Sequence, residues 1–123
     1  LLAVLHAQQQ LFQRQPAEFM GLSLAAQIDL LAHGEAPADA VEKVRTYALI
    51  LEQAARVYEG GNRSSLAVNS RQLALCALLS ATQRWPTQRA ALASAIDSLR
   101  QQIDDEALNP PVRELLSAYD ATA

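Results

Sequence analysis

Residues 73–79 read Leu73-Ala74-Leu75-Cys76-Ala77-Leu78-Leu79 and contain only apolar side chains. They lie in a chain dominated by alanine and leucine, which are strong helix formers. We predict a helix that begins after a cap at Asn62, Ser64 or Ser65 and runs toward Trp85. A helix that is apolar on all sides is buried on all sides, so we expect this one at the centre of a bundle.

The preceding stretch, which starts near Pro37, shows the clearest helical period. Pro37 and Asp39 suit a first helical turn, and Gly60-Gly61 ends the pattern. Apolar residues recur at alternating spacings of three and four, at Val41, Val44, Ala48, Leu51, Ala55 and Tyr58. A second row widens this stripe, at Tyr47, Ile50, Ala54 and Val57. A stripe this wide indicates a helix with more than one neighbour.

Four further helices are predicted, over about residues 1–15, within 17–33, over 87–106 and from 110 to about 119. Their limits fall at Pro16, Gly34, Pro86 and Asn109. No segment alternates between apolar and polar residues, as a strand would. We therefore expect an all-α fold, an antiparallel bundle of five or six helices. Residues 1–123 should form one domain, and because the sequence does not begin with Met we expect a fragment of a longer chain.

One local pattern resembles a known family. Residues 55–74 follow the spacing Ala-x2-Tyr-x-Gly-x6-Ala-x6-Ala, with Tyr58, Gly60, Ala67 and Ala74. This resembles half of a tetratricopeptide hairpin, in which the tyrosine closes the first helix and small residues let the second pack against it. The resemblance covers about one sixth of the chain, and no second copy follows 34 residues later. We interpret it as a shared way to pack a TPR-like central hairpin, and not as family membership.

Charge is unevenly distributed along the chain. The net charge is −3, so no overall basic field favours nucleic acid. Residues 60–103 carry five arginines against one acid, Asp97, while the segments before and after are acidic. This pattern predicts either charge complementarity between packed segments or solvated faces, with a docking patch as the alternative. Nine arginines against one lysine, Lys43, indicate a GC-rich bacterial genome.

No set of residues specifies a metal, a cofactor or a reaction. His6 and His33 are far apart, and neither has a carboxylate three residues away. Cys76 is the only cysteine, and its apolar surroundings predict a small buried hydrophobe rather than a reactive thiol. Asp104-Asp105-Glu106 would place acidic side chains at the C-terminal end of the fifth helix, where the helix dipole disfavours them. We expect either a solvated helix end or a contact with an arginine. We expect no enzyme, no cofactor and no metal.

The corner between the fourth and fifth helices is the one candidate site. Arg84 and Arg89 flank Trp85-Pro86, and an aromatic ring between two guanidinium groups could bind an acidic peptide or an anion. The alternative is a tryptophan packed at a helix corner with its charges outside. The candidate partner-binding residues are therefore Arg84, Trp85 and Arg89.

The resulting hypothesis is a non-enzymatic helical interaction domain, an adaptor, chaperone-like or regulatory module that binds another protein or itself. No apolar run reaches membrane-spanning length and the start does not read as a signal peptide, so we expect a cytoplasmic protein without a membrane or nucleic-acid partner. Two alternatives stay open. One is a bundle that binds a small molecule, and the other is homo-oligomerisation through the stripe on the third helix.

Overall fold

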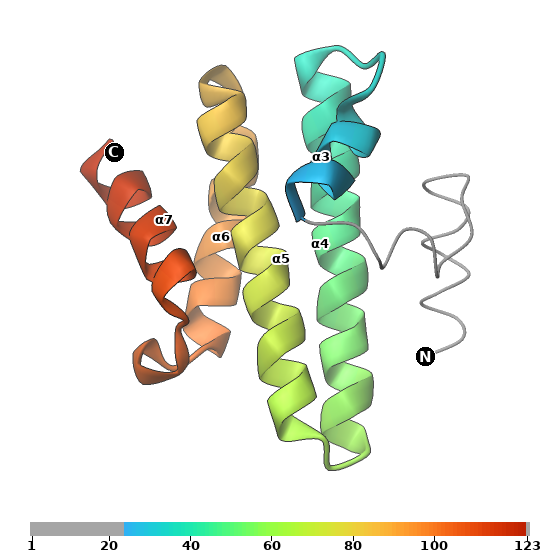
Figure 1. Cartoon of the computed structure of the whole chain (residues 1–123), viewed down its shortest axis with the longest axis vertical. Coiled ribbons are helices and arrows are strands. Elements are labelled where there is room, and N and C mark those ends of the chain that lie inside the picture. Colours follow the sequence, from blue (N-terminus) through green and yellow to red (C-terminus); the bar gives the residue numbers. More distant parts are fainter. Residues whose placement is uncertain (1–23, 123) are drawn as a thin grey trace.

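The structure is a computed structural model that describes residues 24–122 (Figure 1). Within this range the chain is all helical and has no strand, as predicted. Its elements are α3 (Leu24–Ala32), α4 (Pro37–Gly60), α5 (Ser64–Arg84), the 3₁₀ turn η1 (Pro86–Gln88), α6 (Arg89–Gln102), the 3₁₀ turn η2 (Asp105–Ala107) and α7 (Pro110–Ala121). The helix predicted over residues 1–15 and the start of the second lie outside the described residues. None of the described helices is long and apolar enough to cross a membrane.

Helices α4 and α5 form a long antiparallel hairpin at the centre of the structure (Figure 1). The turn between them places Asn62 in the left-handed region, at φ 60°, while Gly61 keeps a negative φ of −95°. Asparagine tolerates this conformation better than most residues. Arg63 is the N-cap of α5, without a side-chain cap, so the predicted cap at Asn62, Ser64 or Ser65 was wrong.

Helix α5 is the central helix, because it packs against α3, α4, α6 and α7. Leu75, Leu78 and Leu79 are almost completely buried. The expectation that this run is buried on all sides was wrong at Leu73, which remains 47% exposed, and at Cys76, which is half-buried. Among residues 24–122, no helix covers the side of α5 that carries Leu73.

The apolar stripe of α4 packs within the molecule. Val41, Val44, Ala48 and Leu51 all belong to the same buried cluster as the leucines of α5. These residues of the stripe therefore belong to the core of the molecule, while Val57 near the end of α4 is 50% exposed.

Helix α3 lies across the hairpin near the start of α4 (Figure 1). The Tyr47 hydroxyl donates a hydrogen bond of 2.6 Å to Gln27 Oε1. Beyond the helix, Gly34 has a φ of 72°, as predicted for a left-handed residue at a helix end.

The fifth helix is shorter than predicted at both ends. Thr87 belongs to η1, and α6 begins at Arg89. At the other end α6 stops at Gln102, because Ile103 takes an extended backbone and is buried. Residues 104–106 therefore do not end a helix, and the predicted conflict with its dipole does not arise.

Candidate functional site

The structure separates the two arginines of the predicted corner. The Arg84 guanidinium lies 5.1 Å from the centroid of the Trp85 ring and forms an ion pair with Asp29 of α3. Trp85 is partly buried and packs against the hydrophobic core. Arg84 and Trp85 therefore lie together, while Arg89 contacts another ring.

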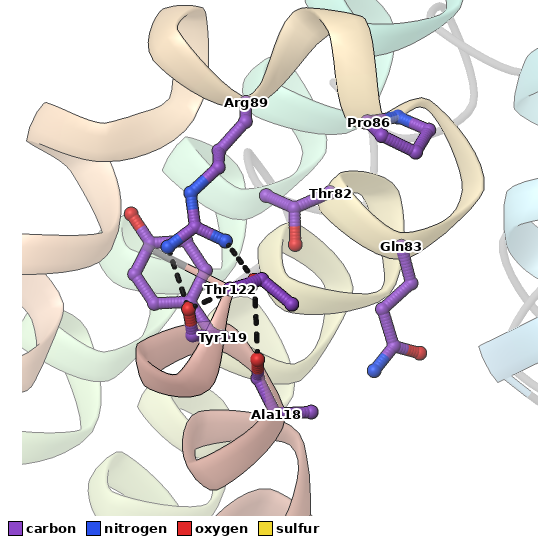
Figure 2. Close-up of a pocket in the computed structure, with 7 residues that line it drawn as sticks. All are labelled: Thr82, Gln83, Pro86, Arg89, Ala118, Tyr119 and Thr122. Carbon is purple, nitrogen blue, oxygen red and sulfur yellow. Dashed lines mark hydrogen bonds between the residues drawn. The ribbon is translucent and has the colours of Figure 1, made fainter.

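Arg89 holds the end of α7. Its guanidinium carbon stacks 3.6 Å from the centroid of the Tyr119 ring. Nη2 donates a hydrogen bond of 2.6 Å to the Tyr119 carbonyl, and Nη1 donates one of 2.7 Å to Thr122 Oγ1 (Figure 2). The Tyr119 carbonyl is one of the last in α7, where carbonyls lack a partner N–H within the helix. Arg89 thus caps α7, a contact that sequence reasoning missed.

A cavity of about 370 Å³ adjoins this contact (Figure 2). Its polar lining comes from Arg89 and from the hydroxyl or amide groups of Thr82, Gln83 and Thr122. Pro86, Ala118 and Tyr119 complete the wall. The volume lies within the range of small-molecule sites, although two nitrogens of Arg89 are already donating to α7 and to Thr122.

A larger and less polar groove lies between α5 and the start of α7. Its volume is about 410 Å³. The lining residues are Asn69, Gln72, Leu73 and Cys76 of α5, with Asn109, Pro111 and Val112. None of these side chains carries a charge at neutral pH. Leu73 is about half exposed at this groove, so apolar surface here is accessible.

Gln72 fixes one wall of this groove. Its Nε2 donates a hydrogen bond of 3.0 Å to the Ala107 carbonyl, and its Oε1 accepts one of 2.7 Å from the Asn109 backbone N–H. The side chain is only 4% exposed. A buried amide with partners on both ends holds the η2–α7 connection against α5.

Cys76 is half-buried in the same groove. Burial raises the pKa of its thiol, and a hydrogen bond with Ser80 offsets part of that rise. The thiol is therefore protonated at neutral pH, which is the unreactive form. It packs against the hydrophobic core, in keeping with the predicted apolar role.

Several arginines of residues 60–103 pair with acids outside that segment. Arg71 pairs with Glu59, Arg84 with Asp29, and Arg100 with Asp120. The hydrogen bond from Arg71 holds the pKa of Glu59 below its usual range. These pairs join α5 to α4 and α3, and α6 to α7. The uneven charge distribution thus reflects contacts between packed helices, the first of the predicted explanations.

A third hollow lies between α4 and α6. Its volume is about 240 Å³, and it is lined by Arg45, Ala48, Leu49 and Glu52 of α4, Leu78 of α5, and Ala91, Ser94, Ala95, Ser98 and Leu99 of α6. Leu49 is 51% exposed beside it. This surface combines an accessible leucine with small residues on the neighbouring helix.

Among residues 24–122 no group of three or more His, Cys, Asp or Glu side chains could hold a metal ion. His33 is exposed just beyond α3, and His6 lies outside the described residues. No protein-family model matches this chain, and comparisons with curated proteins and with solved structures gave no significant match.

Proposed function

We propose that this chain is a non-enzymatic interaction domain, built as an antiparallel helical bundle, that binds an amphipathic helix of another protein between α5 and α7. The observation that carries this proposal is the half-exposed Leu73 at an apolar groove of about 410 Å³. An adaptor, a chaperone-like protein or a regulatory module would each use such a surface.

The lining of the groove favours a partner that presents apolar side chains at helical spacing. Leu73, Cys76, Pro111 and Val112 supply apolar contacts, while Asn69 and Asn109 supply neutral polar groups. On α5, Leu66 is 42% exposed and precedes Leu73 by seven residues, which places both on one face. An amphipathic helix presenting apolar residues at i, i+4 and i+7 would complement this strip.

The rigidity of the groove also supports a binding role. Gln72 ties α5 to the η2–α7 connection through two hydrogen bonds, so the two walls are held at a fixed separation. A pre-formed surface loses little conformational freedom when a partner binds. Cys76 is the only thiol in the chain, and burial keeps it protonated, which supports recognition rather than nucleophilic chemistry here.

The TPR-like hairpin is part of the same proposal. Ala67 and Ala74 are fully buried on α5, and their small size lets α4 approach. We interpret this as the packing device that builds the hairpin, while the partner would bind on another side of α5.

A library of displayed helical peptides would test the proposal on the full chain. We expect selected peptides to carry apolar residues at i, i+4 and i+7, and to shift the methyl NMR signals of Leu73 and Val112. Leu73→Asp should weaken binding by about tenfold or more, because a charge would enter apolar surface. Leu49→Asp is the matched control, a leucine of similar exposure on α4.

Binding should also depend little on salt, because the lining of the groove carries no charge. Peptides that are selected for acidic residues, or that lose affinity steeply with salt, would contradict the proposal. Equal losses for Leu73→Asp and Leu49→Asp would contradict it as well.

A small-molecule site is the second candidate, and the cavity beside Arg89 favours it. Several hydrogen-bonding side chains converge on a space of about 370 Å³ there. A ligand in this cavity should raise the melting temperature of the wild-type chain, but not that of Gln83→Leu, which removes an exposed amide from the wall. A compound screen by thermal shift, with both proteins in parallel, distinguishes this candidate from the helix-binding groove.

A further inference from the structure

A second stripe runs along the outer side of α4. It consists of Glu42, Arg45, Leu49, Glu52 and Arg56, at spacings of three, four, three and four residues. At 100° per residue these positions fall within about 80° of the helix surface. Leu49 is 51% exposed, and the side chains of Glu42, Arg45 and Arg56 are 68%, 48% and 70% exposed. Glu52 lies on the α6 side of the stripe, and its side chain is 15% exposed.

The charges in this stripe are arranged symmetrically about Leu49, with opposite signs at matching distances. Glu42 and Arg56 each lie seven residues from Leu49, about 10.5 Å along the axis. Arg45 and Glu52 lie four and three residues away, about 6 and 4.5 Å. If the helix is reversed and placed against itself, every charge faces one of opposite sign. A parallel arrangement would instead place like charges together.

Within one molecule the same charges already pair along the helix. Arg45 lies 3.6 Å from Glu42, and Arg56 lies 3.3 Å from Glu52. Glu52 also accepts a hydrogen bond of 3.1 Å from Gln102 Nε2 of α6. Each end of the stripe therefore carries one ion pair, with a negative and a positive side chain next to each other.

A small hollow beside Leu49 could receive a side chain from a second molecule. The hollow between α4 and α6 adjoins Leu49, and its α6 side carries small side chains, at Ala91, Ser94, Ala95 and Ser98. Small residues permit close approach of helix backbones. An apolar side chain entering from another molecule would therefore meet Leu49 and these alanines.

We propose that two copies of this chain associate through α4, with the two helices antiparallel about a two-fold axis at Leu49. Arg45 of each copy then faces Glu52 of the other, and Glu42 faces Arg56. Such an interface uses the same patch on both molecules, which a two-fold axis requires. One helix face and one hollow form a small interface, so the dimer is weak and depends on concentration. This proposal is independent of the helix-binding groove, because it uses different residues.

Charge reversal at the outer pair provides the test. Sedimentation velocity of the full chain at low salt should show a monomer–dimer equilibrium. Glu42→Arg places two arginines opposite each other at both ends of the interface, and Arg56→Glu does the same with two glutamates. Each variant alone should dimerise about tenfold more weakly. Each change also breaks one ion pair within α4, but both positions are highly exposed, so the fold should lose little stability.

An equimolar mixture of the two variants should recover the association. In that mixed dimer the arginine introduced at position 42 of one chain faces the glutamate introduced at position 56 of the other, and the native Arg56 faces the native Glu42. A wild-type chain that stays monomeric up to millimolar concentration would overturn the proposal. Single variants that associate as the wild type does, or a mixture that recovers nothing, would also overturn it. Leu73→Asp should leave the dimer intact, and a dimer lost in that variant would assign the interface to the other groove.

Discussion

Tyr47 and Gln27 join α4 to α3 through a hydrogen bond of 2.6 Å between two buried side chains that are 20 residues apart. We expect Tyr47→Phe to lower the free energy of unfolding by about 1–3 kcal/mol, because Gln27 Oε1 loses this donor inside the protein. Urea unfolding of the two proteins measures the difference. Tyr58→Phe is the control at a less buried tyrosine, and an equal loss there would contradict the expectation.

The same tyrosine predicts how stability changes at high pH. Burial raises the pKa of Tyr47 from 10.0 to about 12. The folded chain therefore keeps this proton where the unfolded chain has lost it. The resulting stabilisation is fully present below pH 10 and is lost as the pH rises from about 10 to 12. We expect tyrosinate absorbance at about 295 nm to show one late transition that is missing in Tyr47→Phe. A wild-type titration identical to that of the variant would contradict this.

Gln72 offers a test of the groove wall. Gln72→Ala removes two hydrogen bonds to the backbone around η2 and leaves the Ala107 carbonyl and the Asn109 N–H without these partners. We expect unfolding to become easier by about 1–3 kcal/mol, with faster amide exchange across residues 104–112. Gln83→Ala is the control, because Gln83 is exposed on the same helix. Faster exchange confined to α4 would argue against this role for Gln72.

A substitution at Arg89 can separate the contribution of its hydrogen bonds to α7 from the contribution of its positive charge. Arg89→Lys keeps the charge but loses the planar fork that donates to Tyr119 and Thr122 together. We expect it to destabilise the chain by about 1 kcal/mol and to accelerate exchange at the end of α7. Arg63→Lys, a change at an exposed arginine before α5, provides the comparison. Equal effects of both changes would assign the loss to something other than the cap.

The sequence predicted the helices well wherever a local pattern of residues determines where they lie. The apolar period that starts after Pro37 predicted α4, and Gly34 was placed correctly because a left-handed φ strongly favours glycine. The end of α6 could not be predicted. Residues 103–106 contain no glycine or proline, and the helix stops before Ile103, which is buried in the assembled core.

The candidate sites were harder to predict, because their partners are distant in the chain. Arg89 was grouped with Trp85 because they are close in sequence, yet it contacts Tyr119, 30 residues later. Gln72 was missed, although a single amide beside an apolar run was a usable signal. The spacing of the stripe centred on Leu49 is visible in the sequence, but only the structure shows that this leucine is half exposed.

The hairpin of α4 and α5 also has a consequence for the order of folding. Its two helices are joined by residues 61–63, so their contacts close a very short loop and cost little chain entropy. The contact between Gln72 of α5 and Ala107, just before α7, joins residues that are 35 positions apart. Folds rich in local contacts form quickly, so the hairpin is the natural nucleus. Partial unfolding of the native protein should follow the opposite order. Helix α7 should open as a unit while the hairpin of α4 and α5 stays folded.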